Sequence, residues 1–372
     1  MSKYFSEKYK SLIPYVPGEQ PKDKKYIKLN TNESPFPPSK KAQEMAIEAA
    51  KELNLYPDPD CTKLREDIAE LYNIDKDEVM FVNGSDDILN FAFMAYCDSK
   101  TPAAFADITY GFYEVFAKIN NVPYKIIPLN EKYELNIADY FNLNSTIFIA
   151  NPNAPTGIAI SLKDIEQILQ NNINNIVVID EAYVDFGGES AVKLINKYDN
   201  LLVTQTFSKS RSMAGARLGM CFANKNIIQD LNTIRYSQNP YNINRMTMAV
   251  GIGTINDNEY TIKNCETIIK NREYTISELK KLGFETLKSS ANFIFTRNAK
   301  CSGEYLYKSL KDKGVLVRYF NKDRLKDFVR ITIGSIDQMQ TLIEKIKEIL
   351  EETKWETLKL KEKQKKLISN YS

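Results

Sequence analysis

The chain has 372 residues, of which 43% are hydrophobic, and its 50 basic and 48 acidic residues leave a net charge of +2. This length allows one large domain with a smaller companion, or two domains, and the near-neutral charge gives no reason to expect nucleic-acid binding. The chain contains no histidine, which excludes Ser-His-Asp catalysis, Cys-His catalysis and imidazole metal ligation. Acid–base chemistry near neutral pH must therefore come from lysine, tyrosine, carboxylates or a cofactor.

The sequence shows no sign of export, membrane insertion or cross-linking. No apolar run reaches the ~18 residues that a membrane helix needs, and residues 1–10 lack the apolar segment of a signal peptide. We therefore expect a soluble, cytoplasmic protein. The five cysteines are scattered and form no CxxC pair, so we expect free thiols rather than disulfides or a zinc site.

Residues 1–40 are rich in proline and predict an extended arm rather than a folded unit. From about residue 80 to residue 225, short apolar runs alternate with helical patterns such as 161–170, which opens with a Ser-x-x-Asp capping box. This alternation is typical of a mostly parallel sheet with helices on both faces. The expected strands are 79–82, 103–105, 125–127, 146–150, 176–179 and 201–203.

The C-terminal third has a different pattern. A long charged helix is expected at about 257–282, and apolar runs follow at 293–295, 315–317 and 328–333 before a closing helix at about 336–350. These elements predict a smaller α+β domain. The lysine- and glutamate-rich tail 354–366 is interpreted as a solvated helix or a frayed end.

Lys209 is the most informative residue of the chain. It lies between Ser208 and Ser210, shortly after the expected strand 201–203. An amine held there can form a Schiff base with an aldehyde cofactor, while the neighbouring hydroxyls and Arg217 can bind the cofactor's phosphate. The alternative is an ordinary loop lysine, which an isolated Ser-Lys pair favours.

Gly84, Ser85 and Asp86 follow the expected strand 79–82 and precede a helical run. Backbone N–H groups at the start of a helix bind phosphate well. The alternative is a plain turn and helix cap.

Asp180 ends the expected strand 176–179, and Tyr183 follows three positions later. A carboxylate at this place can pair with a protonated pyridine nitrogen, and Tyr183 can hydrogen-bond a phenolic ring oxygen. Tyr110, after the expected strand 103–105, can stack on an aromatic ring. The alternatives are a strand-terminal turn for Asp180 and simple core packing for Tyr110.

Two further features are compatible with a ligand site. The loop 151–157 contains two prolines and a glycine, so it is rigid enough to present one polar side chain. Arg318 and Arg330 lie within or beside apolar runs, where a guanidinium is costly unless it meets an anion. That anion could be a substrate carboxylate or phosphate, or a structural Asp or Glu.

Together these segments resemble the fold type I pyridoxal-phosphate aminotransferases, and within them the histidinol-phosphate aminotransferases. Lys209 follows Asp180 by 29 positions, and Arg217 follows Lys209 by eight. The resemblance implies a large domain at 41–260 with a mostly parallel, seven-stranded type of sheet between helices. It also implies a small α+β domain at 261–372, to which the arm 1–40 contributes. The other matching segments are 14–15, 29–33, 56–57, 84–86, 110–111, 292 and 329–334.

The resemblance also implies roles and partners. The cofactor would be pyridoxal 5′-phosphate, Lys209 would hold it covalently and move the substrate's proton, and Tyr56 would reach the cofactor phosphate of a neighbouring subunit in a homodimer. No metal, nucleic acid or membrane is expected. The implied catalytic residues are Lys209, Asp180 and Tyr183. The implied cofactor-binding residues are Tyr56, Gly84, Ser85, Asp86, Tyr110, Asn153, Asp180, Tyr183, Ser208, Lys209 and Arg217. The implied substrate-binding residues are Tyr15, Asn32, Tyr241, Asn292, Arg318 and Arg330.

One position departs from the family's pattern. The family's loop carries an asparagine that contacts the ring oxygen, whereas this chain has Ala154 there and Asn153 one position earlier. Either Asn153 makes that contact or Tyr183 makes it alone. Loss of the bond should change the pKa of the lysine–cofactor link rather than abolish binding.

The expected reaction is transamination between histidinol phosphate and 2-oxoglutarate, giving imidazole acetol phosphate and glutamate, as in histidine biosynthesis. One alternative with the same fold is a threonine-phosphate decarboxylase of cobalamin synthesis. Another is an aminotransferase for aromatic amino acids. A third, of a different class, is a non-catalytic cofactor-binding regulator, against which the small net charge of +2 counts.

Overall fold

The computed structural model describes residues 2–10 and 12–369. Contacts divide the chain into two compact units, each assembled from separate stretches of sequence. Unit 1 comprises Met1–Pro17, Glu33–Thr267 and Ser289–Ala291. Unit 2 comprises Gly18–Asn32, Ile268–Lys288 and Asn292–Ser372.

Unit 1 is built on a seven-stranded sheet with the strand order β2-β8-β7-β6-β5-β3-β4. Its strands are β2 (Val79–Val82), β3 (Ala103–Ala106), β4 (Tyr124–Ile127), β5 (Thr146–Ala150), β6 (Val177–Asp180), β7 (Leu201–Thr206) and β8 (Gly219–Ala223). Its helices are α1 (Lys40–Ala50), α2 (Thr62–Tyr72), α3 (Ser85–Tyr96), α4 (Phe112–Ile119), α5 (Leu162–Gln170), α6 (Lys225–Gln238) and α7 (Arg245–Ile255).

The predicted, mostly parallel sheet is confirmed. β4, β3, β5, β6 and β7 pair in parallel, and β8 runs antiparallel to both β7 and β2. β8 is missing from the predicted strands because its sequence, Gly-Met-Cys-Phe-Ala, has no β-branched residue. Its burial against two neighbouring strands outweighs that weak local preference.

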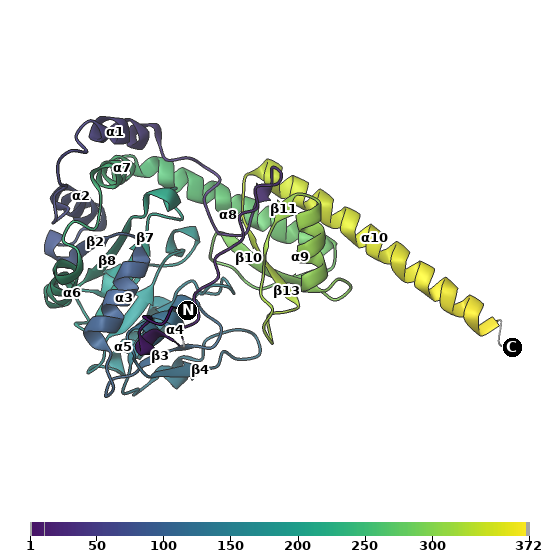
Figure 1. Cartoon of the computed structure of the whole chain (residues 1–372), viewed down its shortest axis with the longest axis horizontal. Coiled ribbons are helices and arrows are strands. Elements are labelled where there is room, and N and C mark those ends of the chain that lie inside the picture. The colour runs from purple at the N-terminus through teal and green to yellow at the C-terminus, as the bar shows by residue number, and fades with distance from the viewer. Residues whose placement is uncertain (1, 11, 370–372) are drawn as a thin grey trace. The chain divides into compact units, whose positions relative to one another are not determined.

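Helices cover both faces of this sheet (Figure 1). Alternate strand residues point to opposite sides, so that Val79 and Phe81 belong to one hydrophobic cluster while Met80 and Val82 belong to the other. Residues of α2, α5 and α7 complete the first cluster, and residues of α3, α4 and α6 complete the second. Unit 1 is therefore a three-layer α/β unit, as predicted.

The capping box predicted for α5 is present. The Ser161 side chain accepts from the backbone N–H of Asp164 at 3.2 Å, and the Asp164 carboxylate accepts from the backbone N–H of Ser161 at 3.0 Å. These bonds satisfy two backbone donors that would otherwise be left open at the helix start. The charged helix α8 (Asn258–Lys281) also follows the prediction, and the boundary between the units falls within it.

Unit 2 contains a four-stranded antiparallel sheet with the order β12-β13-β10-β9, and a two-stranded parallel pair of β1 and β11. The predicted α+β character is confirmed. The strands are β1 (Ile27–Lys28), β9 (Phe284–Thr286), β10 (Phe293–Asn298), β11 (Val315–Leu316), β12 (Arg318–Tyr319) and β13 (Phe328–Thr332). The helices beside them are α9 (Gly303–Asp312) and α10 (Ile336–Ser369).

The closing helix is longer than predicted, because α10 continues past residue 350 to Ser369. The tail 354–366 is thus helical in its backbone, which agrees with its content of lysine, glutamate, glutamine and leucine, all strong helix formers. All five cysteines are buried free thiols, as expected. Within the described part of the chain, no helix is both long enough and apolar enough to cross a membrane.

Candidate active site

Lys209 lies in a short turn that follows β7 at its carboxyl end. The backbone N–H of Ser208 donates to Thr206 Oγ1 at 3.1 Å, and that of Met213 donates to the Phe207 carbonyl at 2.9 Å. These bonds hold the turn closed at both ends. The half-buried Lys209 side chain places its Nζ 5.7 Å from the centre of the Tyr183 ring. The structure thus brings together two of the three predicted catalytic residues.

Asp180, the third, is the last residue of β6, which neighbours β7 in the sheet. Its Oδ2 accepts a hydrogen bond from the hydroxyl of the buried Tyr113 at 2.9 Å. Its Oδ1 is also buried and accepts no hydrogen bond from the described residues. Burial raises the pKa of Asp180 to about 6, although the Tyr113 hydroxyl, the backbone N–H of Ala182 and the charge of Lys209 act in the lowering direction.

The start of α3 forms a cradle with Arg217. Gly84 has a φ of +86°, and a Cβ added there would lie 2.5 Å from Arg217 Nη2, so only glycine allows this approach. Arg217 Nη1 donates to Ser208 Oγ at 3.3 Å. The helix start, the guanidinium and the hydroxyl are the groups that an anion requires. The structure therefore brings Gly84, Ser85, Ser208 and Arg217 together.

Asp86 also lies in this cluster, and its role in binding a phosphate stays a prediction. Its carboxylate lies 3.5 Å from Arg217 Nη2 and accepts the Tyr110 hydroxyl at 2.8 Å. A carboxylate repels a phosphate, so Asp86 can contribute only its backbone N–H at the helix start. Its side chain instead orients Tyr110, whose ring meets that of Tyr113 edge-on at 5.7 Å.

Asn153 bonds its own loop and the neighbouring turn at Ile108 and Thr109. Its Nδ2 donates to the Ile108 carbonyl and to Thr156 Oγ1, both at 3.0 Å, and its Oδ1 accepts from Thr109 Oγ1 at 2.8 Å. These bonds use the amide's two donors and occupy its acceptor. The contact to the ring oxygen, made by Asn153 or by Tyr183 alone, stays a prediction.

Three predicted tyrosines of unit 1 lie nearer to its surface. Tyr15 packs on the Phe112 ring at 4.4 Å, next to the Tyr110 turn. Tyr56 and Tyr241 stack on each other at 4.6 Å, with 78% and 42% of their surface exposed. The roles of Tyr15, Tyr56 and Tyr241 towards a substrate or a partner subunit stay predictions.

In unit 2, Arg318 and Arg330 face each other as cross-strand partners in β12 and β13. Arg330 Nη2 donates to the Asn30 carbonyl at 3.1 Å, and both guanidinium carbons lie near the Phe320 ring, at 5.5 and 5.6 Å. Like charges directly opposite on a sheet are destabilising. Arg318 also has an acidic neighbour in unit 2, because its charge is among the causes that lower the pKa of Glu19.

The other two unit 2 candidates also meet. Asn292 Nδ2 donates to the Asn32 carbonyl at 3.0 Å, and Asn32 exchanges hydrogen bonds of 3.0 Å with Thr332. Asn292 Oδ1 is buried and accepts no hydrogen bond from the described residues. It is therefore a ready acceptor for a ligand donor.

Sequence reasoning missed Tyr113, which bonds the buried Asp180. The signal was present, because Tyr113 lies in the first turn of α4, three positions after the predicted Tyr110. Sequence reasoning also missed Asp185 and Tyr72 as partners of Arg211, which lie 26 and 139 positions from it in sequence and give no local signal.

The raised pKa of Asp180 predicts that affinity for pyridoxal 5′-phosphate falls as the pH drops below about 6. Protonation there removes the charge that would pair with the pyridine nitrogen, so the loss should approach ~10-fold per pH unit. Fluorescence titrations with the cofactor between pH 5 and pH 8 measure how its dissociation constant changes with pH. The cofactor's own phosphate also titrates near pH 6, so Asp180→Asn is the reference. Identical pH slopes in both proteins would contradict the prediction.

Comparison with known proteins agrees with this geometry. The family model described as aminotransferase class I and II matches residues 24–346. The histidinol-phosphate aminotransferase of Brachyspira hyodysenteriae is 51% identical over 352 residues, covering 94% of this chain and 99% of that protein.

Two solved structures share the fold. The first, a histidinol-phosphate aminotransferase from Sinorhizobium meliloti in complex with pyridoxal-5′-phosphate, has a TM-score of 0.85 and 19% identity over 95% of this chain and 99% of its own. The second, an L-threonine-O-3-phosphate decarboxylase from Porphyromonas gingivalis, has a TM-score of 0.76 and 22% identity over 87% and 99%. At these identities the likeness concerns the fold alone. The family match and the 51% identity together show that the chain belongs to the class I and II aminotransferases.

Proposed function

We propose that this enzyme uses pyridoxal 5′-phosphate to transfer an amino group between histidinol phosphate and 2-oxoglutarate, a step of histidine biosynthesis. The products are imidazole acetol phosphate and glutamate. One observation carries the reaction class: Lys209 and the buried Asp180 lie at the carboxyl ends of adjacent strands, where α/β proteins bind their ligands. The assignment of histidinol phosphate as substrate rests on the 51% identical relative from Brachyspira hyodysenteriae.

The residues present fit this cofactor. Asp180 Oδ1 is a buried acceptor without a hydrogen bond from the described residues, and a pyridine N–H is the donor that it requires. The cradle of Gly84 and Arg217, which a Cβ would fill, suits a phosphate group. When bound, the cofactor supplies an electron sink for the substrate's Cα electrons.

The chain's own side chains supply binding and proton transfer. We assign to Lys209 Nζ the attachment of the cofactor and the transfer of the proton from the substrate's Cα. Asp180 keeps its negative charge towards the ring nitrogen, held in place by the Tyr113 hydroxyl at 2.9 Å. Tyr183, whose ring lies 5.7 Å from Lys209 Nζ, would donate to the ring oxygen of the bound cofactor.

We assign the anionic end of the substrate to the arginine pair of unit 2. Arg330→Gln should lower kcat/KM for histidinol phosphate ~100-fold, since charge-assisted hydrogen bonds are worth about 1.5–3 kcal/mol. Steady-state kinetics measure this loss. The thermal unfolding midpoint should fall by only a few degrees, because the substitution removes one hydrogen bond, from Arg330 to the Asn30 carbonyl.

The matched control is Arg297→Gln. Arg297 lies in β10 of the same sheet, and its partner there is Glu285, at 2.8 Å. Its substitution should leave kcat/KM unchanged. Equal losses in both variants would contradict the assignment of Arg330 to the substrate.

The substrate is tested by comparing kcat/KM for histidinol phosphate, phenylalanine and threonine phosphate on the same protein preparation. Histidinol phosphate is expected to give the highest value, with no carbon dioxide from any of the three. A higher value for phenylalanine would identify an aromatic aminotransferase. Carbon dioxide from threonine phosphate would identify a decarboxylase.

The proposal includes a cytoplasmic homodimer. The exposed stack of Tyr56 and Tyr241 supports it, because aromatic side chains are enriched where proteins associate. Sedimentation of the protein with its cofactor tests the dimer, and a species with the mass of one chain would contradict it.

A further inference from the structure

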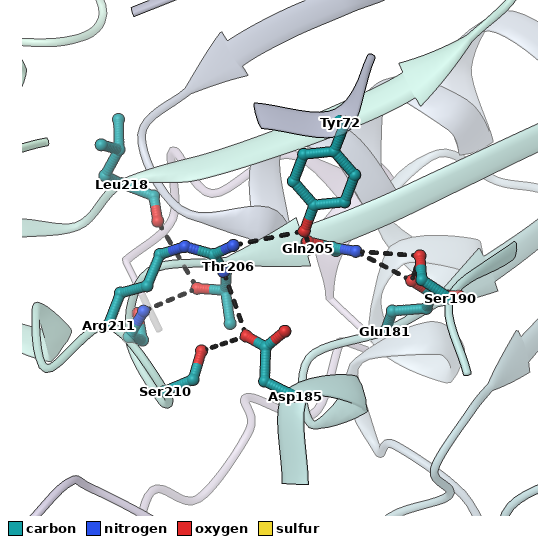
Figure 2. A network of polar contacts seen from close by, with 10 residues as sticks. Tyr72, Glu181, Asp185, Ser190, Gln205, Thr206, Ser210, Arg211 and Leu218 are labelled. Carbon is teal, nitrogen blue, oxygen red and sulfur yellow. Dashed lines mark hydrogen bonds and ion pairs between the residues drawn. The ribbon is translucent and has the colours of Figure 1, made fainter. Parts of the chain in front are cut away.

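A polar network lies behind the Lys209 turn and is not used in the chemistry described above. Ser210 Oγ donates a hydrogen bond to the Asp185 carboxylate, and Arg211 Nη1 lies 3.2 Å from Asp185 Oδ2 (Figure 2). Asp185 belongs to the short 3-10 helix Val184–Phe186, which directly follows Tyr183. The segment that carries Asp180 and Tyr183 is thereby tied to the turn that carries Lys209.

The ion pair between Arg211 and Asp185 is the strongest link between these two segments. Only 6% of Arg211 is exposed, and its guanidinium carbon lies 5.0 Å from the centre of the Phe207 ring. A buried charge requires a partner of opposite charge, and Asp185 provides it. Phe207 and Arg211 lie on either side of Lys209 in sequence, so their contact stabilises the turn itself. Asp185 in addition holds the turn to the segment that follows β6.

A second chain of hydrogen bonds leads back to the same segment. Arg211 Nη2 donates to the Tyr72 hydroxyl at 3.2 Å, and that hydroxyl donates to Gln205 Oε1 at 2.8 Å. Gln205 Nε2 then donates to Glu181 Oε2 at 2.9 Å (Figure 2). The network therefore contacts the segment after β6 twice, at Asp185 and at Glu181, which is next to Asp180. Arg211, from the Lys209 turn, lies between these two contacts in the network.

We propose that Asp185 is a positioning residue for Lys209. Through Ser210 and Arg211 it fixes the Lys209 turn relative to the segment of Asp180 and Tyr183, and so sets where the lysine Nζ lies relative to the substrate's Cα. This inference rests on the proposed function. Catalytic groups must be held within about 0.5 Å of their productive geometry, and a misplacement of about 1 Å can cost ~100-fold in rate.

The test is Asp185→Asn in the enzyme with its cofactor. The substitution keeps the side chain's size and removes the charge opposite Arg211. We expect kcat with histidinol phosphate to fall ~10- to 100-fold while KM stays the same, because the arginine pair of unit 2 is untouched. The kinetic isotope effect with Cα-deuterated histidinol phosphate should rise, since a displaced Nζ slows the proton transfer itself.

A second readout does not depend on activity. Hydrogen exchange in the cofactor-free protein should become faster for the amides of residues 207–213 in Asp185→Asn. The matched control is Asp75→Asn, because Asp75 also combines an ion pair, to Lys225 at 2.6 Å, with a hydrogen bond, from the backbone N–H of Asp77. This control should change neither the isotope effect nor exchange in the turn.

Ser210→Ala keeps the inference testable if Asp185→Asn does not fold. It removes one bond to Asp185 and leaves the Arg211 ion pair intact, so it should shift kcat, the isotope effect and exchange in the same direction but less. The inference is overturned if kcat falls while the isotope effect and exchange stay at their wild-type values, or if kcat does not change. A wild-type enzyme that fails to transaminate histidinol phosphate would contradict the proposed function instead. Hydrogen exchange at residues 207–213 would still test whether Asp185 holds the Lys209 turn in place.

Discussion

Lys209→Ala is expected to abolish transamination and to remove the visible absorbance that pyridoxal 5′-phosphate gives when it is joined to a lysine. The variant loses both the covalent attachment and the proton-transferring amine. The rate should therefore fall by at least ~10⁴-fold, the upper range for one general base. Absorbance spectra and a transaminase assay on the purified variant measure both losses.

Two comparisons make this result specific. Lys209→Arg keeps a positive charge in the turn but no nucleophilic amine, so it should lose the absorbance equally. Lys193→Ala removes an exposed lysine of the same unit, paired with Glu189 at 2.9 Å, and should leave spectrum and rate unchanged. An unchanged spectrum in Lys209→Ala would show that the cofactor is held elsewhere.

Asp180→Asn is expected to reduce kcat ~100- to 1000-fold, the range for removing one preorganised charge contact at a reacting centre. The variant should also bind the cofactor more weakly above pH 6, because the pyridine nitrogen loses its negative partner. Cofactor titration and steady-state kinetics at pH 8 measure these effects.

Unfolding cannot explain such a loss. Burial raises the Asp180 pKa to about 6, so above that pH the charged carboxylate lowers the stability of the cofactor-free fold relative to a neutral group. The unfolding midpoint of Asp180→Asn at pH 8 should therefore equal or exceed that of the wild type. Asp199→Asn, at an exposed position before β7, is the control, and an equal loss of kcat there would contradict the account.

Local signals in the sequence predicted much of the fold and the first residues of the site. Apolar runs located β2 to β7, and the Ser-x-x-Asp pattern located the start of α5. The placement of Asp180 and Lys209 at the ends of such runs was enough to predict that they lie at one edge of a parallel sheet. These features depend on a few neighbouring residues, so the sequence alone displays them.

The remaining features depend on contacts between distant segments. Tyr72 reaches Arg211 from α2, 139 positions away in sequence, and nothing near either residue indicates this bond. Asn153 makes three hydrogen bonds, to Ile108, Thr109 and Thr156, and two of these partners are more than 40 positions away in sequence. Asp86 matched by position, but its carboxylate bonds Tyr110. Partner choice of this kind is fixed by tertiary structure.

The most direct measurement is a single-turnover half-reaction of the purified, cofactor-loaded enzyme with histidinol phosphate in the absence of any 2-oxo acid. We predict that one equivalent of cofactor is converted to its amine form, pyridoxamine phosphate, with release of one equivalent of imidazole acetol phosphate, and that Lys209→Ala shows no such conversion. A cofactor that stays unchanged with histidinol phosphate but reacts with threonine phosphate to release carbon dioxide would contradict the account.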